Sequence, residues 1–321
     1  MGSGSGSGGG AEVVYKSRYF RLYRDGHAER ARVAYDAAPA GFDAETGVTS
    51  KDVVIDAATG VAARLYLPAA QQTAGKAKLP VLVFYHGGHF IVGSPFHPLF
   101  HRYVNSLAAS ARAVAVSVRY RLAPEHPLPA VYDDSWAALR WVASGADPWL
   151  TDHGDLGRVY LSGVSAGANI AHNVAVAAGA SDMLAGTPAR IEGVVLIHPS
   201  FASEQKMEEE DEGFCQANRD RWAVIFPGAN GGLDDPRINP MAAGAPSLAK
   251  MAGKRMLVST ASEDPRAPRG RAYCDAVRTS GWRGELECFE SKGEHAFFVA
   301  EHGSREADKL MDRVADFLGG H

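Results

Sequence analysis

The stretch Gly163-Val164-Ser165-Ala166-Gly167 decides the fold, because it lies between a predicted strand and a predicted helix. Residues 159–162 form an apolar run typical of a buried strand, and a helical pattern of small residues begins at Gly167. A serine on such a sharp strand-to-helix turn needs a strained backbone. Residues two positions away on either side would clash if they carried a Cβ, which explains both glycines. The helix then points its first amide hydrogens toward negative charge that develops beside the serine.

Strands and helices alternate on both sides of this turn. Such alternation predicts one α/β domain over residues 11–321, with a mostly parallel central sheet that is covered by helices on both faces. Strands are expected at residues 80–85, 113–118, 159–162, 191–197, 255–260 and 286–290, after a hairpin-like pair at residues 52–56 and 61–67. Helices are expected at residues 98–110, 130–144, 167–178 and 270–280, and at the C-terminal end behind Ser304.

Two stretches interrupt the alternation, and we expect them to form a helical lid. Residues 15–34 are aromatic and helix-like and follow no strand, which places one lid piece at about residues 15–45. Residues 201–232 are acidic and irregular and directly follow a strand. The run at residues 208–212 is expected to be a solvated face. The aromatic side chains of the two pieces are candidates for substrate binding, with simple lid packing as the alternative; they are Phe20, Phe214, Trp222 and Phe226.

The composition narrows the class of protein. The chain has 321 residues, of which 46% are hydrophobic and 22% are charged, as in an average globular protein. Its first ten residues, MGSGSGSGGG, read as a disordered expression linker. A formal charge of −4 argues against a nucleic-acid partner, and no apolar run is long enough for a membrane span. No apolar signal region follows the linker.

Cysteine usage and motif content bear on the compartment and on cofactors. Cys215, Cys274 and Cys288 are too few for a disulfide framework, and no N-x-Ser/Thr sequon occurs. Both features favour a reducing compartment, so we expect a cytoplasmic or nuclear protein in which each cysteine is a small buried residue. The sequence has no H-E-x-x-H, no P-loop and no nucleotide fingerprint outside the linker, so we expect neither a metal nor a cofactor.

A second glycine motif, His86-Gly87-Gly88, closes the predicted strand that ends at Tyr85. Two glycines at the carboxyl end of a strand let the backbone approach a ligand closely. The N–H groups of Gly87 and Gly88 can donate to an oxyanion together with the N–H group of Ala166. His86 itself is expected to be a structural hydrogen-bonding residue.

A serine hydroxyl is a poor nucleophile unless a base takes its proton. Among the twelve histidines, His295 lies in the loop between the last predicted strand and the C-terminal helix. An orienting carboxylate is expected after the preceding strand, where Glu263 and Asp264 are adjacent, and we favour Asp264. The chain order is then Ser165, Asp264, His295, which is the order of α/β-hydrolases and differs from that of chymotrypsin and of subtilisin.

These motifs together resemble the plant carboxylesterases of the hormone-sensitive-lipase-like branch of the α/β-hydrolases. The resemblance covers essentially the whole chain after the linker, and the same branch includes the gibberellin receptors and the hydroxyisoflavanone dehydratases. Its strings are His86–Phe90, Tyr120–Ala130, Gly163–Asn169, His198-Pro199 and Gly293–Phe298. We interpret the second string as a rigid proline-rich turn near the floor of the pocket.

The chain departs from the family pattern at two places. His89 occupies the last position of the usual His-Gly-Gly-Gly, so an imidazole is expected to line the substrate pocket. After Asp264, the run Pro265-Arg266-Ala267-Pro268-Arg269 replaces a more helical run that contains leucine and aspartate.

Three functions follow from the resemblance. The favoured one is a serine esterase, a monomer or homodimer that hydrolyses small, largely apolar esters through an acyl-enzyme. The second is a dehydratase or eliminase of a plant specialised metabolite; the dehydratases of legumes tend to carry threonine where this chain has Ser165. The third is a hormone receptor or a slow hydrolase that binds a hormone. The resemblance implies that gibberellin receptors lost the base histidine, which this chain retains as His295.

Overall fold

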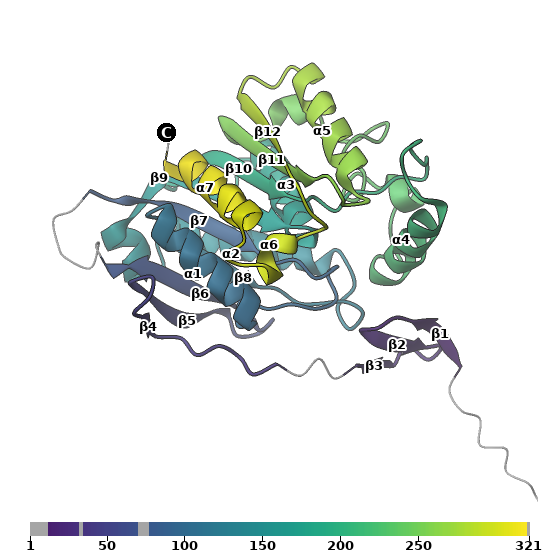
Figure 1. The fold of residues 1–321 in the computed structure, drawn as a ribbon, viewed down its shortest axis with the longest axis horizontal. Helices are drawn as coiled ribbons and strands as arrows, with labels where there is room; N and C mark the ends of the chain where they lie inside the picture. Colours follow the sequence, from purple (N-terminus) through teal and green to yellow (C-terminus); the bar gives the residue numbers. More distant parts are fainter. Residues whose placement is uncertain (1–11, 32–34, 70–76, 320–321) are drawn as a thin grey trace, which may run out of the picture. The chain divides into compact units, whose positions relative to one another are not determined.

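The computed structural model describes residues 12–31, 35–69 and 77–319 (Figure 1). The chain divides into two compact units, Met1–Tyr35 and Asp36–His321. The linker predicted at residues 1–10 lies outside the described residues. Within the described ranges, no helix combines the length and the apolar character that crossing a membrane requires.

The described part of the first unit is a small antiparallel sheet. Its strands are β1 (Val13–Lys16), β2 (Phe20–Tyr23) and β3 (Ala28–Arg30), hydrogen-bonded in that order. The expectation of a helical lid piece is therefore wrong for these residues. β2 alternates apolar and polar side chains, and Gly26, at φ +84°, reverses the chain between β2 and β3. Residues 32–34 of the expected piece lie outside the described part.

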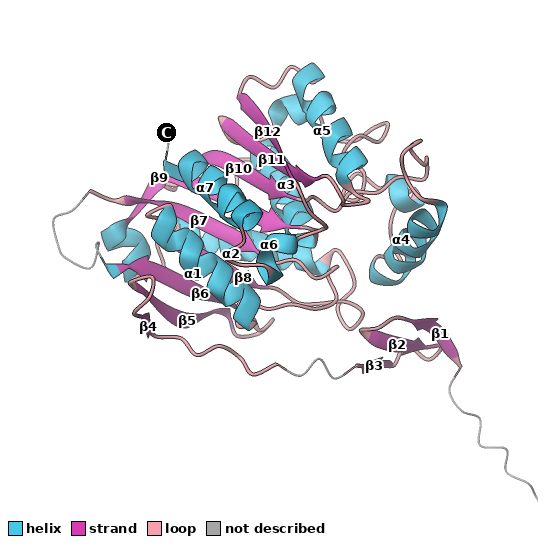
Figure 2. Cartoon of the chain, in the orientation of Figure 1, coloured by secondary structure: helices cyan, strands magenta, loops and turns pink. Residues whose placement is uncertain are grey.

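The second unit is built on a nine-stranded sheet (Figure 2). The strand order is β12-β11-β10-β9-β7-β8-β6-β5-β4. Every pair from β8 to β12 is parallel, and the pairs at the β4 end are antiparallel, so the predicted mostly parallel sheet is confirmed. The strands are β4 (Phe42–Asp43), β5 (Val48–Asp56), β6 (Val61–Pro68), β7 (Leu79–Tyr85), β8 (Val114–Arg119), β9 (Gly154–Val164), β10 (Ile191–Ile197), β11 (Arg255–Ala261) and β12 (Glu285–Ser291).

Helices cover both faces of this sheet, with α1, α6 and α7 on the near face in Figure 2 and α2 and α3 behind it. The near face holds a large apolar core, into which α7 inserts Leu310, Val314, Phe317 and Leu318. The spacing of apolar residues behind Ser304 predicts these four and Met311 as one stripe, and Met311 packs partly buried against the same core. The helices are α1 (Pro98–Ser110), α2 (Ala130–Ala143), α3 (Ala166–Ala180), α4 (Glu212–Ile225), α5 (Ala267–Thr279), α6 (Phe297–Ala300) and α7 (Arg305–Gly319).

The parallel strands bring four distant loops to one edge of the sheet. β7, β9, β11 and β12 run in the same direction, so the loops at their carboxyl ends meet there. Gly87 follows β7, Ser165 follows β9, Asp264 follows β11 and His295 follows β12. Four segments that are remote in sequence can therefore form one site.

Candidate active site

Ser165 occupies the turn between β9 and α3 with φ +57° and ψ −115°, a conformation that residues other than glycine rarely adopt. A Cβ on Gly163 would lie 2.1 Å from the carbonyl oxygen of Gly167. A Cβ on Gly167 would lie 1.9 Å from the carbonyl oxygen of Tyr85. Both positions therefore require glycine, for the reason that the sequence predicts. The turn is held in place by the Ser165 N–H group, which donates to the carbonyl oxygen of Ile197 at 2.9 Å.

The structure brings Ser165, His295 and Asp264 into one hydrogen-bonded chain. His295 Nε2 lies 2.8 Å from Ser165 Oγ, and His295 Nδ1 lies 2.5 Å from Asp264 Oδ2. A carboxylate only accepts hydrogen bonds, so Nδ1 carries the ring hydrogen and Nε2 is left to accept from the serine hydroxyl. The adjacent Glu263 is exposed to solvent. The arrangement can move a proton from the serine hydroxyl to the imidazole.

Asp264 is buried but has several donors that favour its charged form. The Arg266 N–H group donates to Asp264 Oδ1 at 2.9 Å, and the Arg266 guanidinium lies 3.7 Å from the same oxygen. Burial by itself raises the pKa of the Asp264 carboxyl, but the hydrogen bond from His295 and the nearby Arg266 together hold that pKa below its ordinary value. The carboxylate is therefore available to orient the imidazole.

The surroundings of His295 favour its neutral form. Burial of the ring lowers the pKa of His295 below its ordinary value, and the positive charges of Arg266 and Arg221 act in the same direction. The Asp264 carboxylate opposes this effect only in part. A neutral imidazole with a free lone pair toward Ser165 is the form that a general base needs.

The glycines after β7 approach the Ser165 turn. A Cβ on Gly87 would lie 2.9 Å from the carbonyl oxygen of Val164 and 3.4 Å from the Cβ of Ser165. His86 Nδ1 lies 2.7 Å from the Gly87 carbonyl oxygen. The Gly87 carbonyl and the Gly88 N–H belong to one planar trans peptide group and point in opposite directions. Because the carbonyl faces His86, the N–H group of Gly88 points away from His86. Ala166 is the first residue of α3, where backbone N–H groups have no partner within the helix.

His86 has the structural role that the sequence predicts. Its ring is fully buried and stacks on Tyr120 with 4.2 Å between the centroids. The Tyr120 hydroxyl also donates to the His86 carbonyl oxygen at 2.6 Å. Burial lowers the pKa of His86 to about 4, so the ring stays neutral and fixes the peptide that bears the Gly88 N–H group.

His198 supports the His295 loop, a role that sequence reasoning did not assign. The Ala296 N–H group donates to His198 Nδ1 at 2.9 Å, and the His198 and His295 rings lie 5.9 Å apart. Burial lowers the pKa of His198 to about 3. The available signal was the position of His198 directly after β10, at the carboxyl edge where the other loops meet.

The side chains of His198, Asp264 and His295 also have the chemistry of metal ligands, with ligand atoms within 4.8 Å of one another. Hydrogen bonds already occupy the ring nitrogens of His295, the carboxylate of Asp264 and His198 Nδ1, whereas His198 Nε2 has no partner among the described residues. His295 uses both ring nitrogens for Asp264 and Ser165, and His198 Nδ1 accepts from Ala296. Binding a metal there would break the chain that links the serine to the aspartate, so we assign no metal to the group. The absence of a metal and of a cofactor stays a prediction.

Helix α4 lies within the insertion predicted at residues 201–232 and contacts two of the site loops. Trp222 is buried, and its ring lies 5.3 Å from that of Phe90, in the loop after β7. The Arg266 guanidinium lies over the Phe214 ring at 5.0 Å, in the loop after β11. Two of the predicted lid aromatics are thus placed against the loops that carry the site.

The other candidate substrate contacts differ in their surroundings. Phe226 caps the C-terminal end of α4 and is buried. The guanidinium of Arg237 lies over its ring, 4.4 Å from the ring centroid, so the observed contact of Phe226 is one of packing. His89 is half-buried and adopts φ +58° directly after the two glycines. Phe20 lies on β2 in the first unit. Substrate contacts by these three residues stay predictions.

The acidic run at residues 208–212 is not wholly a solvated face, as was expected. Glu210 is only 5% exposed and forms a bidentate ion pair with Arg269 of α5, with both bonds at 2.6 Å. Planar guanidinium and carboxylate groups match in this geometry. The ion pair ties the insertion to α5, the helix that follows Asp264, so the Glu210 carboxylate anchors the insertion.

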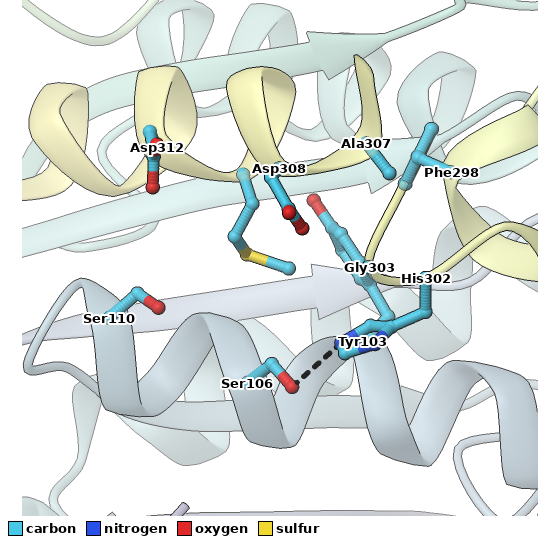
Figure 3. Close-up of a pocket in the computed structure, with 10 residues that line it drawn as sticks. Tyr103, Ser106, Ser110, Phe298, His302, Gly303, Ala307, Asp308 and Asp312 are labelled. Carbon is cyan, nitrogen blue, oxygen red and sulfur yellow. Dashed lines mark hydrogen bonds between the residues drawn. The ribbon is translucent and has the colours of Figure 1, made fainter. Parts of the chain in front are cut away.

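A separate pocket of about 200 Å³ lies between α1 and α7 (Figure 3). Across this pocket, Ser106 Oγ on α1 forms a hydrogen bond with His302 Nε2 at 3.1 Å. Asp308 and Asp312 are one turn apart on α7 and are exposed at its rim. The pocket contains none of the residues that the sequence predicts for the site.

Comparisons with known proteins agree with the fold. A family profile for the α/β hydrolase fold matches residues 82–299. A 2-hydroxyisoflavanone dehydratase from Glycyrrhiza echinata is 44% identical over 310 residues, which cover 93% of each chain. A probable carboxylesterase 3 from Arabidopsis thaliana is 36% identical over 309 residues, which cover 94% of this chain and 96% of that protein. A hyperthermophilic esterase from the archaeon Pyrobaculum calidifontis superposes with a TM-score of 0.68 at 26% identity, over 84% of this chain and 85% of the other.

Proposed function

Because the chain belongs to the α/β-hydrolase family, together with plant carboxylesterases and 2-hydroxyisoflavanone dehydratases, we propose that it is a serine carboxylesterase for small, largely apolar esters. One observation carries the proposal: Ser165 Oγ, His295 and Asp264 form a continuous hydrogen-bonded chain at a strained turn. This is the constellation that acyl transfer through a serine requires. The proposed chemistry uses neither a metal nor a cofactor. The cytoplasmic or nuclear location stays a prediction.

Acylation begins when Ser165 Oγ attacks the ester carbonyl carbon. His295 Nε2 takes the hydroxyl proton, and Asp264 holds the imidazole tautomer and stabilises the imidazolium that forms. The carbonyl oxygen becomes an oxyanion, which accepts hydrogen bonds from the N–H groups of Gly87, Gly88 and Ala166. His295 then returns the proton to the alkoxide leaving group, and an acyl-enzyme remains on Ser165.

Deacylation repeats these steps with water as the nucleophile. His295 takes a proton from the water molecule that attacks the acyl carbonyl, and the same three N–H groups stabilise the second oxyanion. When this intermediate collapses, His295 gives its proton to Ser165 Oγ. The carboxylic acid leaves, and the enzyme returns to its starting state.

The aromatic side chains of α4 support an apolar substrate class. Trp222 and Phe90 pack together beside the proposed oxyanion donors, and Phe214 packs on Arg266 beside Asp264. Apolar side chains on the loops of the proposed site favour acyl or alcohol groups that lack charge. They do not select one ester.

The direct test is covalent labelling. We expect the purified protein to hydrolyse p-nitrophenyl acetate and to take up one equivalent of a fluorophosphonate, seen as a single adduct by intact-mass spectrometry and mapped to the peptide with Ser165. Slow or absent labelling, with ester hydrolysis at the level of buffer, would contradict the proposal.

A dehydratase is the second candidate, because a relative with that name is 44% identical over nearly the whole chain. Elimination of water needs a base such as His295 but leaves no acyl group on Ser165. Parallel incubations of the protein with a 2-hydroxyisoflavanone and with p-nitrophenyl acetate distinguish the dehydratase from the carboxylesterase. Efficient release of the isoflavone with only marginal ester hydrolysis would favour the dehydratase.

We expect hydrolysis to persist to lower pH than an ordinary histidine base allows. Only the neutral imidazole accepts the Ser165 proton, and the pKa of His295 is lowered, so the acid limb of kcat/KM should lie below pH 6.5. Arg266→Gln removes a cation that lowers the pKa of His295. The pKa should therefore rise in this variant, and the acid limb of kcat/KM should move to higher pH. Arg271→Gln, on an exposed side chain of α5, is the matched control. A limb that stays in place in Arg266→Gln would refute this role of the arginine.

The insertion at residues 201–232 should influence substrate choice without controlling the chemistry. Trp222→Ala or Phe214→Ala should change relative rates across acyl chain lengths by roughly 10- to 200-fold at most, since one methylene in an apolar pocket is worth about 1–3 kcal/mol. Kinetics with p-nitrophenyl esters of increasing chain length measure the effect. Fluorophosphonate labelling of Ser165 should stay near the normal rate. A selectivity profile that neither variant alters would mean that the pocket is built from other residues.

His89→Gly should change selectivity for polar esters while activity survives. The proposed donors are the preceding glycine amides, and glycine adopts the observed φ of +58° without strain. Comparing kcat/KM for a hydroxylated and an alkyl ester of equal size measures the change. If this variant were as inactive as one without Ser165, His89 would belong to the catalytic chemistry.

A further inference from the structure

Two of the three cysteines face each other between α5 and the edge strand β12. Cys274 lies on α5 and is buried, whereas Cys288 lies on β12 and is exposed. Both line a pocket of about 340 Å³, and their thiols interact as hydrogen-bond partners. The expectation that every cysteine is buried therefore holds for Cys274 only: Cys288 is exposed on β12, an edge strand of the described sheet, and Cys215 is half-buried on α4.

The two thiols have different surroundings. Arg278 Nη2 lies 3.2 Å from Cys288 Sγ. Nη1 of the same guanidinium donates a hydrogen bond to Asp275 Oδ1 at 2.8 Å. An exposed sulfur in contact with a cation is the kind of environment in which reactive cysteines occur. The pKa of the Cys274 thiol lies above its ordinary value, chiefly because of burial and also because it faces Cys288. The Cys288 sulfur is thus accessible to solvent, and the neighbouring Cys274 thiol is buried.

We propose that Cys288 and Cys274 are a redox-active pair that a hydroperoxide converts into a disulfide. The Cys288 thiolate attacks one peroxide oxygen, the O–O bond breaks, and Cys288 becomes a sulfenic acid while the alkoxide or hydroxide takes up a proton. The Cys274 sulfur then attacks the Cys288 sulfur. The S–O bond breaks, and the leaving hydroxide combines with the Cys274 proton to form water. The two sulfurs together lose two electrons, which reduce the peroxide.

Cys215 provides an internal contrast. It is half-buried on α4, and its Sγ lies 3.8 Å from a carboxylate oxygen of Glu210. Burial and then the Glu210 charge raise the pKa of the Cys215 thiol. An anionic neighbour disfavours the thiolate, so Cys215 should stay reduced under conditions that oxidise Cys288.

The pair connects two elements that lead to the proposed active site. α5 begins at Ala267, shortly after Asp264, and β12 ends at Ser291, shortly before His295. A disulfide between Cys274 and Cys288 would therefore cross-link the helix that follows the aspartate loop to the strand that precedes the histidine loop. The redox state of the pair can be measured without ester hydrolysis, so this inference and the proposed function can fail separately.

The test is disulfide mapping on the full chain. The reduced protein is treated with hydrogen peroxide, quenched in acid and alkylated under denaturing conditions. We expect one alkylation adduct where the reduced protein takes three, and a tryptic species that joins residues 272–278 to residues 284–292. Dithiothreitol should restore all three adducts. Cys215→Ser should form the same linked species, and Cys288→Ser should form none.

Two outcomes would overturn the inference. One is oxidation of Cys288 to a sulfinic or sulfonic acid while Cys274 remains fully alkylatable. The other is a disulfide that includes Cys215. Arg278→Gln tests the cation separately and should slow disulfide formation about two- to fivefold, the size expected for an exposed charge pair. Arg271→Gln, which removes a cation from the same pocket without contacting Cys288, should leave the rate unchanged.

Discussion

Ser165→Ala is expected to reduce hydrolysis of a short-chain p-nitrophenyl ester by a factor on the order of 10⁶ and to abolish fluorophosphonate labelling. The loss is this large because the Ser165 hydroxyl forms the acyl bond, and it is the side-chain hydroxyl that His295 Nε2 contacts while Nδ1 contacts Asp264. Steady-state rates and intact-mass spectrometry measure the two effects. Labelling that survives the substitution would remove Ser165 from the mechanism.

Ser162→Ala is the matched control for this substitution. Ser162 lies on β9 close to the turn and is fully buried, and its Oγ has no hydrogen-bond partner among the described residues. Removing that hydroxyl costs no hydrogen bond, so activity and labelling should remain near normal. Thermal unfolding of both variants should show one transition, as in the unmodified protein. A similar loss in both variants would point to damage at the turn instead of a missing nucleophile.

His295→Ala should be almost as inactive as Ser165→Ala, because the members of such a chain act as a unit. Asp264→Asn should reduce kcat by a factor on the order of 10⁴, since an amide no longer selects the tautomer in which Nδ1 carries the hydrogen. Measuring kcat separately from KM tests this reason, because the carboxylate is not expected to touch the substrate.

Glu263→Gln is the control for the choice of carboxylate. Its side chain is exposed, although it is adjacent to Asp264 in the sequence. Activity should therefore stay near that of the unmodified protein. A large loss in Glu263→Gln with normal rates in Asp264→Asn would reverse the assignment.

The strands and helices of the main sheet are largely predictable because their signals are local. The apolar run before Ser165 is a strand, and the small residues after it form α3, as their spacing indicates. The stretch at residues 15–34 misled sequence reasoning. Its aromatic residues fit a helical face as well as a strand, and the turn at Gly26 decides in favour of short antiparallel strands.

By itself, the sequence determined the strained turn at Ser165, the alternation of strands and helices around that turn, and a short list of partners for the serine. Glycine spacing and apolar periodicity involve residues that are close together in the sequence, so they can be recognised without a structure. Only the tertiary structure decided that His198 supports the loop of His295, that Glu210 is buried against Arg269, and that Cys288 is exposed beside Arg278. Such contacts join residues far apart in the chain, and their existence depends on how the sheet brings its loops and edges together.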